Sequence, residues 1–321
     1  MSTFTATATS LPIARLHLLA RADAPLTLPP YAGSMLRGAF GHALLALAPL
    51  PHTDGQPCAL QDACPYCQIF ATPPLPTHSL QKFSQMPHPY VIEPPAGGAQ
   101  RLSPGETFQF SLVLIGKALT HLATIILAWE RALRAGLGVQ QARCTLLAVQ
   151  HENGETLWTA DDRNTASIGA SPPPLPPAST LDGQTALHLS SPLRLQQQGK
   201  PARANTIDAR SLLVTLARRW QLLLDVHLGD RAPQQDFPAL AAQAAAIELV
   251  PTGLRWFDWG RFSQRQQQEM KFGGLTGSLQ LHGDLAPFGE LLHLGQWLHV
   301  GKNASVGLGG YRIDLPTTVL Q

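Results

Sequence analysis

Residues 298–311 read LHVGKNASVGLGGY, and this stretch holds four glycines and one lysine between an apolar segment and a short β-like exit. Glycine permits positive φ angles and the close approach of another backbone. Successive backbone N–H groups in such a loop can form an anion-binding concavity. A tight connector would use the same glycines for its turns. The stretch alone therefore leaves two interpretations open, an anion-binding loop and a structural connector.

The elements before this loop follow a recognisable order. A predicted strand leads to a helix, two or three further strands, a second helix and then the glycine loop. The predicted ranges in this half are the strand Gln184–Leu195, the helix Asp208–Leu228, strands near Ile247–Val250, Leu254–Trp259 and Leu275–His282, and the helix Pro287–Trp297.

The first half repeats that order. A strand is followed by a helix that begins at Tyr31 and has one apolar stripe, and later come a strand, a helix and a hairpin. The ranges are Ile13–Leu19, Thr107–Gly116, Ala118–Ala135, Cys144–Gln150 and Thr156–Thr159. We interpret both halves as β-α-β-β-α-β, with the strands less clearly marked in the first half, and this is the order of the ferredoxin-like fold. We predict an α+β protein with two tandem ferredoxin-like domains and a carboxyl-terminal glycine-rich loop.

The run of prolines at residues 171–177 is the clearest boundary, since it can join neither a helix nor a sheet. We expect domains at 1–178 and 179–321, with a proline-rich, cysteine-containing insertion at about 49–95 in the first.

The composition is that of a folded protein whose net charge is too small to give a strong electrostatic field. Of 321 residues, 44% are hydrophobic and 14% charged, which excludes general disorder. The formal net charge of +2 means that local clusters must carry any binding of nucleic acid. Neither a secretory signal nor a long apolar run is visible, so a cytoplasmic protein with no membrane association is expected.

Three of the four cysteines lie close together in the sequence. Cys58, Cys64 and Cys67 have the spacing C-x5-C-x2-C, and C-x2-C is a common half-site for zinc. His52, His78 and His88 lie in the same stretch, and His52 is one candidate for a fourth ligand. We expect such a zinc to be structural and not catalytic. Reduced thiols without a metal are the alternative.

Histidine is the usual general acid or base near neutral pH, and two of the twelve histidines have suggestive neighbours. His42 lies on the polar side of the first predicted helix, near Tyr31 and Arg37. His299 precedes Lys302 by three positions. For most single histidines, however, a surface position without a function is the ordinary interpretation.

The segment Arg255–Arg265 interleaves aromatic and basic residues. Arginine can bind phosphate with two hydrogen bonds, and aromatic rings can stack on unpaired bases. An edge strand with core tryptophans and solvated arginines would show the same pattern. A second basic run precedes it, part of which would form the outer face of a helix. Its members are Arg194, Lys200, Arg203, Arg210, Arg218 and Arg219.

Several common catalytic motifs are missing from the sequence. There is no P-loop, no G-x-G-x-x-G after a strand, no H-E-x-x-H, no G-x-S-x-G and no cluster of carboxylates suited to magnesium. Any catalysis would have to depend on histidine, tyrosine and lysine, or on a mechanism without a metal.

The duplicated order and the terminal glycine loop resemble the repeat-associated (RAMP) superfamily of CRISPR systems. Within it, the chain is similar to the endoribonucleases that process precursor CRISPR RNA. The stretches that carry the resemblance are Tyr31–His42, Cys58–Phe70, Trp256–Gln266 and Gly273–Tyr311.

This resemblance implies cleavage of repeat RNA without a catalytic metal, through attack of a 2′-hydroxyl on the adjacent phosphate. It implies His42 or His299 as acid or base, Tyr31 as a group that orients the hydroxyl, and Lys302 as a phosphate ligand. Members place the catalytic histidine at different positions. The expected RNA contacts are Arg37, Arg255, Arg261, Arg265, Lys271, Gly301, Lys302, Ser305, Gly307 and Gly309.

Two other functions remain open at this point. A non-catalytic RAMP subunit would bind guide RNA among the proteins of an effector complex. A general module for single-stranded RNA would bind without preference for the repeat.

Overall fold

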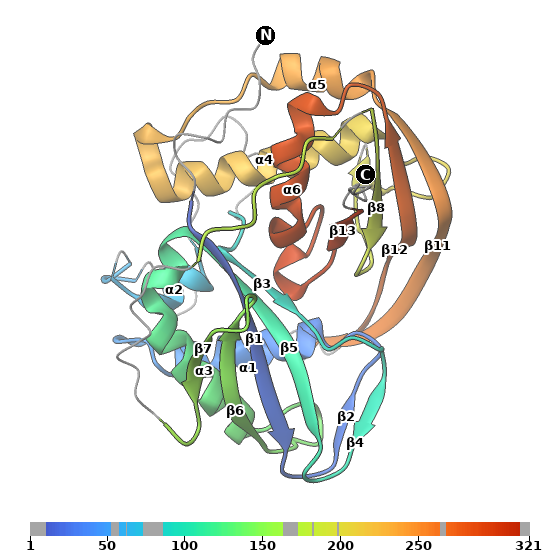
Figure 1. Ribbon diagram of the computed structural model, residues 1–321. Coiled ribbons are helices and arrows are strands. Elements are labelled where there is room, and N and C mark those ends of the chain that lie inside the picture. The colour runs from blue at the N-terminus through green and yellow to red at the C-terminus, as the bar shows by residue number, and fades with distance from the viewer. Residues whose placement is uncertain are drawn as a thin grey trace, which may run out of the picture. The chain divides into compact units, whose positions relative to one another are not determined.

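The computed structural model describes residues 11–52, 58–61, 63–72, 86–162, 173–181, 183–197, 199–263 and 268–314, except for the side chains of residues 261–263 and 268–272. The chain forms two compact units, and it passes from one to the other between Leu175 and Pro176, inside the proline run (Figure 1). Each unit is described by itself below.

The amino-terminal unit is built on an antiparallel sheet in the order β3-β5-β1-β6-β7. The central strand β1 pairs with β5 on one side and with β6 on the other. Alternating buried and exposed residues in β5 explain why this segment forms a strand with one face in the core. The bounds are β1 Ile13–Ala22, β3 Tyr90–Glu93, β5 Thr107–Ile115, β6 Cys144–His151 and β7 Thr156–Thr159.

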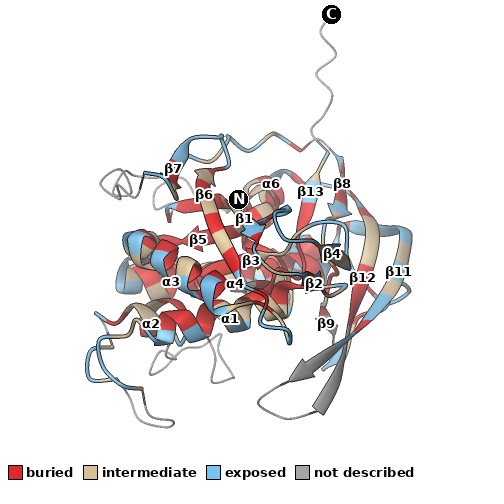
Figure 2. Ribbon diagram, turned by 90° about the horizontal axis from the view of Figure 1, so that it is seen from below, coloured by how far each residue is buried: buried red, intermediate tan, exposed pale blue. Residues whose placement is uncertain are grey.

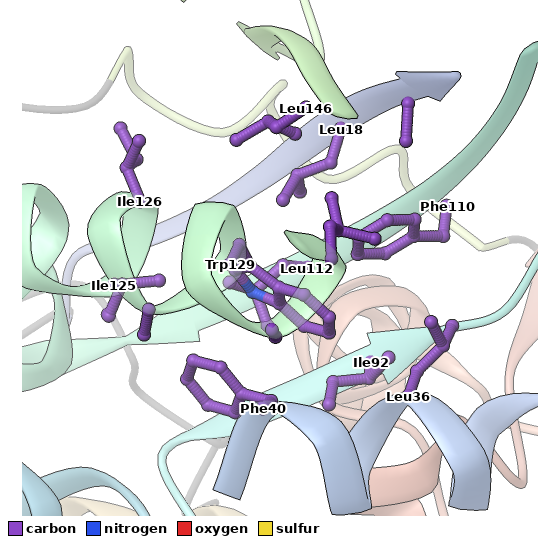
Figure 3. Close-up of a cluster of buried hydrophobic side chains, with 14 of the residues drawn as sticks. Leu18, Leu36, Phe40, Ile92, Phe110, Leu112, Ile125, Ile126, Trp129 and Leu146 are labelled. Atoms are coloured by element: carbon purple, nitrogen blue, oxygen red, sulfur yellow. The ribbon is translucent and has the colours of Figure 1, made fainter. Parts of the chain in front are cut away.

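Two helices, α1 (Gly33–Leu45) and α3 (Leu122–Ala135), supply the rest of the core of this unit. Phe40 of α1 stacks on Trp129 of α3 with ring centroids 5.0 Å apart, and Phe110 of β5 packs against the same tryptophan (Figure 3). All three rings are almost completely buried. Burial of large aromatic side chains of this kind is a main source of stability in a small unit.

Smaller elements complete the amino-terminal unit. A 3-10 turn, η1 (Gly116–His121), leads into α3, and a short helix, α2 (Pro65–Ile69), follows the first cysteines. The strands β2 (Leu26–Leu28) and β4 (Gln100–Leu102) form a separate ladder. The buried Arg15 of β1 pairs with Glu93 at 3.0 Å and also with Glu152, so its buried positive charge is compensated by carboxylates.

The carboxyl-terminal unit has a four-stranded antiparallel sheet in the order β11-β12-β8-β13. β8, the first strand of this sheet in sequence, lies between β12 and β13, which are the third and the fourth. The amino-terminal sheet has the same arrangement, since its first strand, β1, lies between its third and fourth strands, β5 and β6. This shared order is consistent with the predicted duplication. The bounds are β8 Gln184–Leu189, β11 Glu248–Ser263, β12 Gln268–His282 and β13 Tyr311–Ile313.

The long helix α4 (Ala209–Leu228) begins where Asp208 accepts a hydrogen bond from the Ser211 amide at 2.6 Å, an N-cap that fixes the start of the helix. Figure 2 shows a buried and an exposed side along the helices, as expected for helices that cover a core. The other elements are β9 Gln196–Gln197, β10 Lys200–Pro201, η3 Gly229–Arg231, α5 Phe237–Ala245, η4 Ala286–Phe288, α6 Gly289–Leu298 and η5 Ala304–Val306.

The strand predicted at Gln184–Leu195 ends at Leu189, and the helix predicted from Ala118 begins at Leu122 after a 3-10 turn.

Three larger differences concern whole elements. The expected insertion at 49–95 contains a strand of the main sheet, β3, which is hidden in the sequence because prolines flank it. The two strands expected at Ile247–Val250 and Leu254–Trp259 are one strand, β11, because an irregularity between Thr252 and Arg255 interrupts the ladder without ending it. The helix α5 was not expected.

No helix in the described ranges combines the length and the apolar character that a membrane span requires.

Candidate functional site

Helix α1 presents the first group of candidate residues. His42 is exposed in the last turn of the helix, and Tyr31 and Arg37 are half-buried. The apolar side of the same helix is held in the core through Leu36 and Phe40. A rigid helix therefore carries His42 on its solvent side, where the imidazole can accept or donate a proton.

Arg37 is held in a defined position by two contacts on its polar head. Its guanidinium carbon lies 4.3 Å from the centre of the Phe70 ring, and its Nη2 donates to Nε2 of His88 at 3.1 Å. A cation over an aromatic face is attracted by the ring quadrupole. Since a guanidinium can only donate, His88 accepts through Nε2 and its ring is neutral in this arrangement.

Phe70 also joins α2 to α1. A methyl group at Gly41 would come within 2.3 Å of the Phe70 ring, so glycine is required for this close approach. The ring of Phe70 stacks with Tyr66, Tyr90 and His88 at centroid distances of 5.5, 6.1 and 6.2 Å. Burial raises the pKa of Tyr90, and the charge of Arg37 opposes this shift only in part. Tyr90 therefore remains a neutral phenol.

The cysteine cluster lies next to these rings. One ligand atom each from His52, Cys58, Cys64 and Cys67 falls within 4.8 Å of all the others. Cys64 and Cys67 are buried, and Nε2 of His52 lies 3.3 Å from Sγ of Cys64. Burial, together with the neighbouring thiols Cys64 and Cys58, raises the pKa of Cys67 to about 12. All four residues named for the metal site in the sequence are thus brought together.

The glycine loop of the carboxyl-terminal unit is a tightly bonded structure. Gly301, Gly307 and Gly309 have positive φ angles, and a methyl group at Gly301 would come within 2.5 Å of the Arg194 carbonyl oxygen. A side chain at Gly309 would collide with the carbonyl of Val300. These glycines therefore serve close packing of backbone on backbone.

The backbone donors of the loop are largely occupied inside the protein. Lys302 donates to the carbonyl of Arg194 at 2.8 Å, Gly307 to Ala304 at 2.8 Å and Gly309 to Pro192 at 3.0 Å. The interpretation of this stretch as an anion-binding concavity of N–H groups does not fit these bonds. Gly307 and Gly309 are also buried, which removes them from the accessible surface.

His299 belongs to the packing of the same loop. Its side chain is buried, and Nδ1 donates to the carbonyl oxygens of Gly307 at 3.0 Å and Leu308 at 3.2 Å. It terminates α6 with a positive φ of 58°. We therefore assign His299 to the loop structure rather than to the chemistry. The sequence could not show this, because the partners lie in a tertiary contact.

The side chains that the glycine loop leaves on the surface are polar. Lys302 and Asn303 are exposed and Ser305 is half-buried. Lys302 follows Gly301, whose backbone is fixed against Arg194, so the base of the lysine side chain is held while its charged end reaches into solvent.

The aromatic and basic segment lies on β11. β11 is at the edge of its sheet, Trp259 is buried and Arg255 is exposed, as an edge strand with core tryptophans and solvated arginines would have them. RNA binding by Arg255 stays a prediction. The guanidinium of Arg203 lies 4.0 Å from the Trp256 ring centre, and Nε1 of Trp256 donates to Asp258 at 2.6 Å. One face of Trp256 is therefore already covered. Arg265 lies outside the described residues, as do the side chains of Arg261 and Lys271.

A basic cavity of about 1270 Å³ lies between α4, α5 and the strands β9 and β10. Lys200, Arg203, Arg210 and Arg218 line it, with Asp208 as the acidic residue of the lining. Four members of the second basic run in the sequence therefore share one surface. A cavity with this charge is suited to a polyanion.

Arg219, the last member of that run, has a different position. It is half-buried, and its Nε donates to the carbonyl of Leu298 at the carboxyl end of α6, at 2.8 Å. Burial lowers the pKa of Arg219 to about 10. A cation at this end of a helix is favoured by the helix dipole, so Arg219 stabilises the fold.

Two family models match the chain. Residues 187–311 match the family described as CRISPR-associated endoribonuclease Cas6. Residues 11–169 match a family described as an N-terminal domain. The two matches divide the chain as the two compact units do. No curated protein matches the chain.

Solved structures share the fold of the whole chain. A Cas6 (TTHB231) product complex has a TM-score of 0.58 at 17% sequence identity, with 94% of this chain and 100% of that chain covered. Thermus thermophilus Cas6 (TTHB231) has a TM-score of 0.51 at 14% identity, covering 95% and 100%.

A partial Cas6-RT-Cas1--Cas2 complex has a TM-score of 0.55 at 14% identity. The match covers 97% of this chain and 47% of the chain in that complex, so the chain in the complex is about twice as long. The fold is therefore that of these Cas6 structures. Residues 187–311 belong to a segment that matches the CRISPR-associated endoribonuclease Cas6 family, within a chain that has the fold of these Cas6 structures.

Proposed function

We propose that this protein is an endoribonuclease that cuts the repeat RNA of a precursor CRISPR transcript to release mature guide RNA, and that it acts in the cytoplasm. The observation that carries the proposal is the match of residues 187–311 to the Cas6 endoribonuclease family, on a chain whose fold is that of Cas6 throughout. We further propose that its two units are tandem ferredoxin-like domains, on the ground of their shared sheet order.

The reaction that we propose needs no catalytic metal. The ribose 2′-oxygen attacks the adjacent phosphorus, and the bond from phosphorus to the 5′-oxygen of the next nucleotide breaks. A base takes the proton of the 2′-hydroxyl and an acid protonates the leaving 5′-oxygen. The products carry a 2′,3′-cyclic phosphate and a 5′-hydroxyl.

His42 is our choice for the acid or base. Its imidazole is exposed on a helix that the core fixes in place, whereas that of His299 is buried and bonded to carbonyl oxygens. Positioned groups of this kind contribute about 100- to 10,000-fold to the rate of a reaction that transfers protons. We propose that Tyr31, two residues before α1, orients the attacking hydroxyl.

RNA contacts follow from the exposed basic side chains. Lys302 on the glycine loop and Arg255 on β11 are exposed, and the basic cavity beside α4 adds a surface that the sequence indicated only as a run of charges. We propose that these groups bind the phosphates of the repeat, where charge and not base identity determines the affinity.

The test is the cleavage rate of the cognate repeat RNA in buffer without divalent cations, for the wild type, His42→Ala and a matched control. His188→Ala is suitable as the control, since His188 is another exposed histidine and its Nε2 lies 2.8 Å from Oδ2 of Asp314. We expect cleavage by the wild type and by the control, and a loss of about 100-fold or more in His42→Ala.

Intact RNA with the wild-type protein would contradict the proposal. If the protein then binds the repeat tightly, it is a non-catalytic subunit. An unchanged rate in His42→Ala would contradict the choice of this histidine while leaving the activity itself in place.

A further inference from the structure

The cysteine cluster is not used by the reaction proposed above, yet its four side chains converge in the fold. Among the described residues next to Cys58 and Cys64, the amide of Gln61 donates to the carbonyl of Cys58 at 3.1 Å and the amide of Cys64 donates to the carbonyl of Leu60 at 2.7 Å. Cys64 is the N-cap residue of α2, and Cys67 is the third residue of this helix. This local geometry brings Cys58 back towards the C-x2-C pair.

The spacing of the donor atoms suits a tetrahedral metal ion. Zn–S bonds of 2.3 Å and Zn–N bonds of 2.0–2.1 Å place the donors of a tetrahedral site about 3.3–3.8 Å apart. The four donor atoms here lie within 4.8 Å of one another, with His52 Nε2 already 3.3 Å from Cys64 Sγ. Small side-chain rotations would close the site, and its three sulfurs and one imidazole nitrogen form a donor set that favours zinc.

We propose that His52, Cys58, Cys64 and Cys67 bind one zinc ion in a closed structural site, with Nε2 of His52 as the fourth ligand. All four positions are filled by protein atoms, so no open position for water or substrate remains, and this distinguishes the site from a catalytic zinc.

The ion has a defined role in the fold. The helix α2 has five residues, which is too short to be stable by itself. It carries Tyr66, whose ring packs against His52 with centroids 4.8 Å apart, and it leads directly to Phe70, which supports Arg37. The zinc therefore anchors α2 so that Phe70 stays over Gly41 and holds the guanidinium of Arg37 in place.

The first measurement is the metal content of the full chain. We expect one zinc per chain in the wild type and in Cys144→Ser, and less than a tenth of that in Cys58→Ser, Cys64→Ser and Cys67→Ser. Cys144 is the matched control, since it is a buried cysteine of the same unit whose Sγ donates to the carbonyl of Ala142 at 3.4 Å. His52→Ala should weaken zinc binding by at least about tenfold.

A second measurement keeps the proposal testable if a cysteine variant fails to fold. Metal-free wild-type protein is titrated with Co²⁺, and the visible spectrum should show tetrahedral coordination with thiolate charge-transfer bands that saturate at one equivalent. Hydrogen–deuterium exchange of residues 65–70 should be faster without metal, while that of β1 and β5 should change little.

Three results would overturn the proposal. They are a wild type with far less than one zinc per chain that also gives no tetrahedral Co²⁺ spectrum, zinc that is retained in Cys67→Ser, and a disulfide within the cluster in freshly purified protein. None of these measurements depends on RNA cleavage, so the zinc site and the proposed activity can fail separately.

Discussion

Lys302 and His299 show how neighbouring residues of one loop take different roles. His299 is buried, and its Nδ1 donates to two carbonyl oxygens. Lys302 is held through its backbone amide, which donates to the carbonyl of Arg194, while its side chain is exposed. The first therefore fixes the loop and the second is available to a ligand. The sequence places both three residues apart on the same stretch and cannot distinguish them, since the difference lies in contacts formed only after folding.

For Lys302→Ala we predict weaker binding of repeat RNA with a smaller dependence on salt. Loss of one phosphate contact to a single strand should reduce the slope of log K against log salt by about 0.7. The measurement is the dissociation constant at several salt concentrations. Arg134→Ala is the control, because Arg134 is an exposed cation on α3 whose partner is Glu130, and its slope should equal that of the wild type.

At the scale of elements, the contact of α1 with the segment after α2 can be tested through two glycines of one helix. A methyl group at Gly41 would lie 2.3 Å from the Phe70 ring, whereas one at Gly38 would meet nothing within 4 Å. Gly41→Ala should lower the free energy of unfolding by about 1–3 kcal/mol through overpacking. Gly38→Ala should raise it by about 0.5–1 kcal/mol, as alanine does in an exposed helix position.

Urea unfolding of both variants measures this difference. A Gly41→Ala protein as stable as the wild type would show that Phe70 does not rest on α1. The Gly38→Ala variant is the control for the helix propensity of alanine, since both changes add a methyl group to the same helix. A difference between the two free energies of unfolding therefore reports the contact with Phe70.

Elements with a strong hydrophobic pattern could be predicted from the sequence. Elements whose conformation depends on contacts with the rest of the fold could not. The helices α1 and α4 follow from their apolar stripes, and the N-cap Asp208 predicts the start of α4. Helix α5 is rich in alanine and has no clear stripe, although Asp236, which accepts from the Ala239 amide at 3.0 Å, and Pro238 are start signals that could have found it. Strand β3 is hidden because prolines surround it.

The candidate site was predictable to a similar degree. Residue types and spacing suffice to group the three cysteines, with His52 as one of three candidate histidines, and to name His42 and His299 as alternatives; only the structure places His52 at the cysteines and buries His299. The support of Arg37 by Phe70 and His88 could not be predicted, because these residues come from parts of the chain far apart in sequence. The same holds for the basic cavity, whose lining arises from a helix, a turn and a second helix.

At the scale of the whole molecule, stability should fall at acidic pH. Burial lowers the pKa values of His151 and His293, with nearby glutamates opposing the shift in part. Both histidines are therefore neutral in the folded protein at a pH where the unfolded chain begins to bind protons, near 6.5. As the pH falls below about 6.5, the unfolded state binds more protons and the free energy of unfolding decreases.

The urea midpoint between pH 7.5 and 5 measures this dependence. The double variant His151→Gln, His293→Gln should show a smaller decrease than the wild type, and the comparison separates the two histidines from other groups that titrate in this range. Equal pH dependence in the two proteins would contradict the assignment.

The most direct test of the central claim is incubation of the wild-type protein with two repeat RNAs, without divalent cations. One is the natural repeat, and the other carries a single 2′-deoxyribose at the nucleotide before the cut. We predict that the natural RNA is cut to products with a 2′,3′-cyclic phosphate and a 5′-hydroxyl, and that the deoxy RNA is bound but stays intact. Cleavage of both RNAs, or of neither, would contradict the account.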